Sequence, residues 1–145
     1  MQSLVLIILL ALLGGIAVGI QSPLASLMSQ RLGLLESILI INLGGALCAG
    51  VPLILMGGGQ LSAWQRIPWY ALGAGVFGLV VIGAVSAAIP RVGASATIIL
   101  IVAGQLVVGV LIDQFGVFDT LVRPLDLLRV AGLALVLLGA WLVIR

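Results

Sequence analysis

The chain has 145 residues, of which 63% are hydrophobic and only 7% charged, and its mean hydropathy is +1.46. A soluble domain has about 25% charged residues, and so short a chain could not hide this much apolar surface from water. A formal net charge of +2 spread over short loops also excludes a nucleic-acid-binding surface. The solvent for this chain is therefore a lipid bilayer.

Five segments are long and apolar enough to cross a bilayer, which takes about 20 mostly apolar residues. They lie at about 3–22, 36–56, 69–89, 93–113 and 127–144. The first lacks the basic start of a signal peptide, so we expect it to be retained as a span. Helices are predicted throughout, because backbone groups inside lipid must be paired and alternating strand patterns are absent. The prediction is an all-α integral membrane protein, with residues 1–145 as a single transmembrane domain.

The first span contains a polar residue, Gln21, shortly before Pro23. Proline lacks an N–H and leaves a carbonyl without its helical partner. Inside a membrane, such a carbonyl is tolerated only where it faces protein or a wet cavity. The sequence therefore predicts an irregular helix here, which either ends near Ser22 or continues toward Gln30, with Gln21 facing a polar pathway.

The second span opens with Glu36 and carries Asn42 six residues later. A carboxylate is stabilised at a helix N-terminus, so Glu36 is either a helix-end charge or a pathway residue. Asn42 lies inside the span and needs a hydrogen-bonding partner in lipid. Both are candidates for a substrate pathway.

The fourth span carries Gln105 near its centre and Asp113 at its end, eight residues apart and on related faces of one helix. For Gln105 the alternatives are a helix–helix hydrogen bond and a pathway position. Asp113 either ends the helix in the headgroup layer or lies within the membrane. In the second case desolvation would favour its protonated form, and it could exchange a proton for a cation.

Glycine is enriched about twofold over the average, with 20 residues clustered inside the spans. The small-residue pairs include Gly15 with Gly19, and Gly75 and Gly78 each four residues after an alanine. Such faces let helix backbones approach closely in lipid, where no hydrophobic drive exists. We expect helix packing at these four glycines, with a sliding surface as the alternative.

The arginines are divided equally between the two sides of the membrane. Alternating spans place Arg66, Arg123 and Arg129 on one side, and Arg31, Arg91 and Arg145 on the other. Basic residues near span ends set the orientation of a membrane protein, so equal numbers of arginines on the two sides do not specify one. One arginine could count less than the others, or both orientations could insert and pair as an antiparallel homodimer, or a partner of opposite orientation could exist. In such a dimer Glu36 of one copy and Asp113 of the other would share a membrane face.

The segments VGASATIILIVAGQLVVGVLIDQFGVF and VRPLDLLRVAGLALVLLGAWLVI resemble a small five-span bacterial family of the drug/metabolite transporter superfamily, the YdcZ-like proteins. GGIAVGIQ and IPRVGA fit the same family. The resemblance implies one inverted-repeat unit of a ten-helix transporter in the bacterial inner membrane, paired with a second copy or with a homologue of opposite orientation. Ala25 stands where an asparagine often follows the first-span glutamine, and the glutamate of the four-span relatives is absent.

The resulting hypothesis is a secondary transporter of an unidentified small molecule, working as an antiparallel dimer with a midplane substrate site. Its pathway residues would be Gln21, Glu36, Asn42, Gln105 and Asp113. The alternative is a non-transporting assembly or regulatory subunit. An enzyme is not expected, because the sequence shows no histidine, no metal-ligand cluster and no nucleophile beside a base. No cofactor or metal is predicted.

Overall fold

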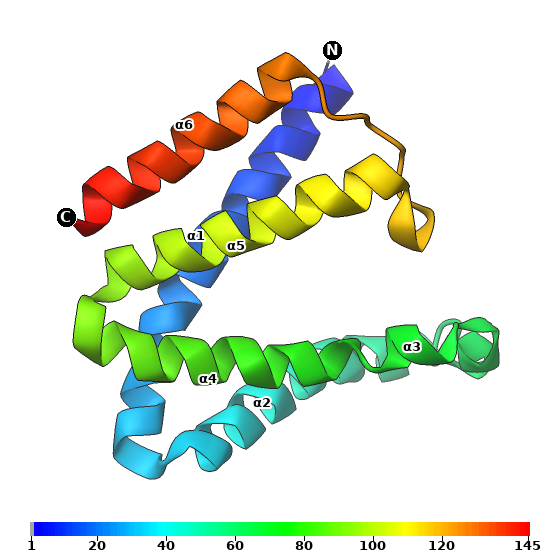
Figure 1. The fold of residues 1–145 in the computed structure, drawn as a ribbon. Helices are drawn as coiled ribbons and strands as arrows, with labels where there is room; N and C mark the ends of the chain where they lie inside the picture. Colours follow the sequence, from blue (N-terminus) through cyan, green and yellow to red (C-terminus); the bar gives the residue numbers. More distant parts are fainter. Residues whose placement is uncertain (1) are drawn as a thin grey trace. The chain divides into compact units, whose positions relative to one another are not determined.

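The computed structural model describes residues 2–145, with side chains from residue 4 onward. The described residues form helices and loops, and five of the helical segments are long and apolar enough to cross a membrane. The prediction of an all-α integral membrane protein with five spans is therefore confirmed. The chain divides into two compact units, Met1–Pro90 and Arg91–Arg145 (Figure 1). The single transmembrane domain stays a prediction.

The first unit contains the three spans that surround the candidate site. Its helices are α1 (Gln2–Leu32), α2 (Leu34–Leu55), the 3-10 turn η1 (Leu61–Arg66), the short α3 (Trp69–Leu72), and α4 (Ala74–Val92), whose last two residues belong to the second unit. Helices α3 and α4 together make one membrane-spanning segment.

Helix α1 continues through Pro23 to Leu32, ten residues past the end predicted near Ser22 and close to the longer alternative toward Gln30. A break here would leave backbone groups unpaired in lipid, which costs more than the single donor that proline removes. The Ser22 hydroxyl donates to the Val18 carbonyl over 2.8 Å, one turn before the proline. With 31 residues, α1 is about 46 Å long against a hydrocarbon core of about 30 Å, so it tilts or reaches into the headgroup layer.

A single glycine separates α1 from α2. Gly33 has φ 108° and ψ 160°, a region that essentially only glycine occupies. Its N–H donates to the Ser29 carbonyl over 3.0 Å, and its carbonyl accepts from the Ser37 N–H over 3.2 Å. One residue therefore closes α1 and opens α2, which makes the two helices an antiparallel pair.

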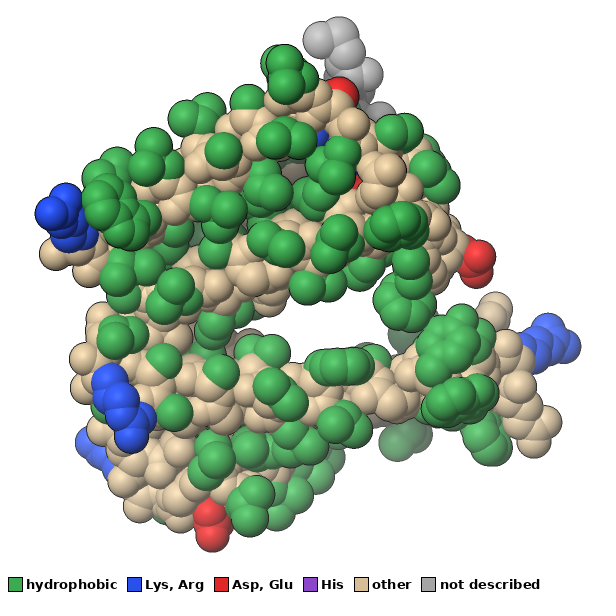
Figure 2. Space-filling view, in the orientation of Figure 1, with side chains coloured by type: hydrophobic (Ala, Val, Ile, Leu, Met, Phe, Trp, Pro, Cys, Tyr) green, Lys and Arg blue, Asp and Glu red, His purple; other side chains and the backbone are tan. Residues whose placement is uncertain are grey.

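The core of the first unit is small and lies near this turn. Ala25 of α1, Ile38 of α2 and Ile82 of α4 form the buried cluster, with Ile41 packed against it. Elsewhere most large apolar side chains are exposed, as Figure 2 shows by the hydrophobic side chains that cover the visible surface. Such a surface is stable only against lipid or another protein chain.

The second unit is a helical hairpin made of α5 (Ala94–Phe115) and α6 (Leu127–Ile144), which pack side by side. Gly116 ends α5 in the left-handed conformation, with φ 61°. The short η2 (Val117–Asp119) follows, and Phe118 and Asp119 also have positive φ angles. Asp126 begins α6 by accepting a hydrogen bond from the Arg129 N–H over 2.7 Å.

A repeat with an offset of 60 residues relates the turn between α1 and α2 to the turn between α4 and α5, and it was not part of the sequence predictions. SLMSQRLGLLESIL, residues 26–39, and SAAIPRVGASATII, residues 86–99, share the pattern S-x4-R-x-G-x3-[ST]-I. Gly93, the counterpart of Gly33, has φ 86° and ψ 164°, and its carbonyl accepts from the Thr97 N–H over 3.2 Å. The buried positions 22, 25 and 26 likewise recur at 82, 85 and 86.

Candidate functional site

Two of the predicted pathway residues lie in one open groove of the first unit. The groove has a volume of about 510 Å³ and is formed by α1, α2 and α4. Its lining residues are Gln21, Ile41, Asn42, Gly45, Ala46, Gly78, Val81 and Ile82. Small residues on α2 and α4 make the space, and the two amides supply its polar groups. The sequence identified both amides as polar residues within apolar spans, but it did not indicate that they share a groove.

The two amides differ in how much of their hydrogen-bonding capacity is used. Asn42 donates from Nδ2 to the Ile38 carbonyl of its own helix over 2.8 Å, which leaves one N–H and Oδ1 available. Gln21 has no hydrogen-bond partner among the described residues. Both side chains are exposed. In hydrocarbon an unpaired amide is costly, so the free polar groups of both side chains require a partner, which the described residues do not provide.

A second groove adjoins the first and is almost entirely apolar. It has a volume of about 430 Å³ and shares Gln21 and Ile41 with the first groove. Its lining residues are Ala17, Ile20, Gln21, Leu24, Ala25, Met28 and Ile41. Gln21 therefore stands between a space with amides and a space lined by hydrocarbon.

Gln105 lies on α5, in the second unit, with an exposed side chain and no hydrogen-bond partner among the described residues. The helix–helix hydrogen bond that the sequence allowed is thus not made within the described chain. When the 60-residue offset is extended past the repeat, Gln105 falls opposite Gly45, which lines the groove of the first unit. Sliding the sequence against itself by 60 residues would have revealed this relation.

Glu36 lies outside both grooves, in the first turn of α2. Its carboxylate folds back over Gly33, so closely that a Cβ at Gly33 would overlap it. A negative charge is stabilised at this position by the unpaired N–H groups of the helix start. The geometry matches the helix-end alternative for Glu36.

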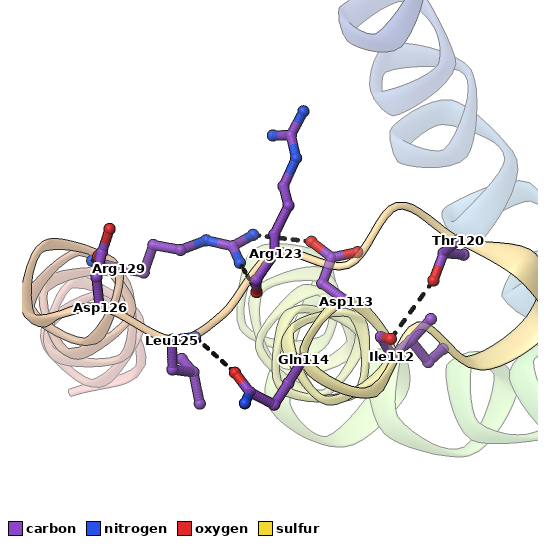
Figure 3. Close-up of polar contacts among 8 residues, drawn as sticks. All are labelled: Ile112, Asp113, Gln114, Thr120, Arg123, Leu125, Asp126 and Arg129. Atoms are coloured by element: carbon purple, nitrogen blue, oxygen red, sulfur yellow. Dashed lines mark hydrogen bonds and ion pairs between the residues drawn. The ribbon is translucent and has the colours of Figure 1, made fainter.

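Asp113 makes an ion pair that was not foreseen from the sequence. Arg129 of α6 donates from Nη2 to Asp113 Oδ2 of α5 over 2.8 Å, and the two side chains are 29% and 35% exposed. Arg129 also donates from Nη1 to the Arg123 carbonyl over 2.6 Å, and the Arg123 N–H donates to the Asp113 carbonyl over 2.9 Å (Figure 3). We call these three residues, Asp113, Arg123 and Arg129, the α5–α6 clasp. They tie the end of one span to the start of the next.

The clasp predicts a specific loss of stability. Asp113→Asn should lower the free energy of unfolding by about 1 kcal/mol, because a partly exposed ion pair is worth no more than that. Arg129→Gln should have at least the same effect, since it also loses the bond to the Arg123 carbonyl. Unfolding titrations in mixed micelles would measure the change.

The matched control is Asp119→Asn, which removes the same charge six residues further along the chain, at an exposed residue of η2 with no ion pair among the described residues. Exchanging the charges, with Asp113→Arg and Arg129→Asp combined, should recover part of the loss. Equal stability of the Asp113→Asn and Asp119→Asn proteins would contradict the clasp.

The four glycines for which we expect helix packing have open space beside them. A Cβ built on Gly15, Gly19, Gly75 or Gly78 would meet no atom within 4 Å, apart from the excluded near neighbours in the chain. Gly78 instead lines the groove with the amides. Close packing at these positions stays a prediction, and it would have to involve atoms beyond the described contacts.

Comparison with known proteins assigns the sequence to a family. A sequence profile of the DMT_YdcZ family, described as "Putative inner membrane exporter, YdcZ", matches residues 6–142. No curated protein and no solved structure gives a match. The profile covers nearly the whole chain, including all five membrane-spanning helices except the outermost residues of the first and last. This inner-membrane chain, with its five spans, belongs to the DMT_YdcZ family.

Proposed function

We propose that the chain is a small-molecule exporter of the drug/metabolite transporter superfamily, working as an antiparallel dimer with a substrate site near the membrane middle. The observation that carries this proposal is the shared groove of Gln21 and Asn42. Two exposed amides facing one open space are costly in lipid and useful to a polar ligand.

The depth of the groove supports a site away from both membrane surfaces. Asn42 is eight residues from the start of α2, which is about 12 Å along a helix of about 33 Å. The hydrocarbon core is about 30 Å thick, so Asn42 lies well inside it. A ligand bound at Asn42 would therefore be some distance from either aqueous phase, as alternating access requires.

The groove is open on one side, and the exposed glycines would let another helix approach closely. Both features support a second copy that closes the groove. Within this proposal Gln21 and Asn42 bind the substrate, and Gln105 contributes to the same pathway. Glu36 and Asp113 serve at the two mouths, where an antiparallel pair would put one of each on either membrane face. The equal arginine count supports insertion in both orientations.

The orientation of the copies tests this proposal. The C-terminus would be fused in parallel to a reporter active only in the cytoplasm and to one active only outside the inner membrane. We expect comparable signals from both fusions when expression is equal. A signal from one reporter alone would contradict the antiparallel homodimer and leave a partner of opposite orientation as the remaining form of the proposal.

A second experiment shifts the balance of charge deliberately. Arg66→Gln should move most copies to the orientation with Arg31, Arg91 and Arg145 in the cytoplasm, because one side then has an excess of arginine. Arg31→Gln should move them to the opposite orientation. Reporter ratios unchanged by both substitutions would show that the arginine tie has no role.

A further inference from the structure

We propose that the exported molecule is an uncharged amphiphile, with an amide or hydroxyl group held by Gln21 and Asn42 and an apolar part held in the adjoining groove. This inference rests on the proposed export function, and it adds the chemical class of the substrate. It depends on three properties of the two grooves: their charge, their hydrogen-bonding groups and their shared wall.

Neither groove contains a charged residue. Both linings consist of glycine, alanine, aliphatic residues, one methionine and the two amides. A full charge that leaves bulk water for a site inside the membrane is stabilised there by an opposite charge. The nearest acid along α2 is Glu36, six residues and about 9 Å of helix from Asn42, and it folds back over Gly33 instead. A permanently charged substrate would therefore lack a counter-charge at this site.

The free hydrogen-bonding groups suit a neutral ligand. Gln21 offers both donors and acceptors, and Asn42 keeps one N–H and Oδ1 after bonding to the Ile38 carbonyl. A carboxamide or a hydroxyl also donates and accepts, so it can pair with both side chains at once. An ammonium group would leave the N–H donors without an acceptor, and a carboxylate would leave the amide oxygens without a donor.

The shared wall determines the shape of the ligand. Gln21 and Ile41 line both grooves, and the second groove has Gln21 as its only polar residue. The volumes of about 510 and 430 Å³ each lie in the range of small-molecule sites. A molecule whose polar end meets Gln21 can thus lay a short hydrocarbon part along Ile20, Leu24 and Met28. A lipid chain alone would fill the second groove but leave the Gln21 amide unpaired.

The test measures protection of a cysteine in the groove. Ala46→Cys would be introduced with Cys48→Ser, and the protein would be reconstituted in lipid nanodiscs. Its reaction with a small hydrophilic thiol reagent would be followed with hexanamide, hexylammonium or hexanoate present at equal concentration. These three probes share one chain length and differ in charge. We expect hexanamide to slow the reaction about threefold or more at about twice its dissociation constant or above, and the two charged probes to have little effect.

Adding Gln21→Leu should remove the protection by hexanamide, because the polar end loses its partner. Equal or better protection by either charged probe would overturn the inference, as would protection that persists in the Gln21→Leu protein. These outcomes leave the export function itself to be judged separately, by the loss of export in leucine variants. Intact export of a charged compound, with no protection by hexanamide, would refute only the substrate class.

Discussion

Replacing both Gln21 and Asn42 with leucine is expected to reduce export at least about tenfold at equal expression, and each single replacement about three- to tenfold. Each amide contributes one hydrogen bond to the ligand, worth about 1 kcal/mol, and a loss of 1.4 kcal/mol is a tenfold change. Leucine fits the lipid-facing surface and is a good helix former, so the fold should persist. The measurement is efflux of a compound against which the parent protein protects cells, chosen from a panel of dyes and antibiotics.

The control for this pair is Leu43→Asn, which lies beside Asn42 on α2, is 55% exposed and lines neither groove. Combined with Asn42→Leu, it moves the amide to another face of the same helix while the composition stays constant. We expect this swapped protein to export as poorly as Asn42→Leu. Undiminished efflux by the double leucine protein would contradict the amide site, because export would then depend on neither amide.

Substituting the turn glycines should have the largest effect on folding. Gly33→Ala is expected to lower the free energy of unfolding by about 3 kcal/mol, and Gly93→Ala by about 1 to 3 kcal/mol. Both backbones occupy a region where a side chain is strained, and at Gly33 the new Cβ would also overlap the Glu36 carboxylate. At Gly93 no atom lies within 4 Å of that position, so only the strain remains.

Denaturant titration in mixed micelles, with helical content followed by circular dichroism, would measure both values. Gly139→Ala is the matched control, because Gly139 lies within α6 and a Cβ there meets no atom within 4 Å. Alanine favours the helix interior, so this protein should be at least as stable as the parent. Combining Gly33→Ala with Glu36→Ala should recover part of the loss at Gly33. Equal stability of all three single variants would show that the turns do not depend on glycine.

The helices could be predicted from the sequence because hydropathy and length decide them in lipid. The end of α1 was left open, because Pro23 made both an end near Ser22 and a continuation toward Gln30 plausible. In water a proline in mid-span often ends a helix, but in a membrane the free ends would cost more than the missing bond. The structure follows the second alternative and runs on to Leu32.

Of the candidate site, only the polar residues within the apolar spans could be predicted, and their arrangement in space could not. The positions of Gln21 and Asn42 on their helices are readable, but their common groove depends on how α1 and α2 rotate against each other around Gly33. Asp113 was recognised as unusual, yet its partner Arg129 lies 16 residues away, across a loop whose path follows from the positive φ angles at Gly116, Phe118 and Asp119. Local pattern does not specify such a path. The 60-residue repeat, in contrast, was present in the sequence and needed only a comparison of the chain with itself.

We expect the amide groove to be polar and wet at a depth where the rest of the chain faces hydrocarbon. In a Cys48→Ser background, cysteines would be placed one at a time at Gly45, which lines the groove, and at Leu43, which is exposed elsewhere on the same helix at nearly the same depth. Thiols react as thiolates, which require water. In intact vesicles we predict that the cysteine at position 45 reacts with a hydrophilic thiol reagent at least about tenfold faster than that at position 43. Equally slow reaction at both positions would contradict a wet groove and, with it, the site on which export was proposed.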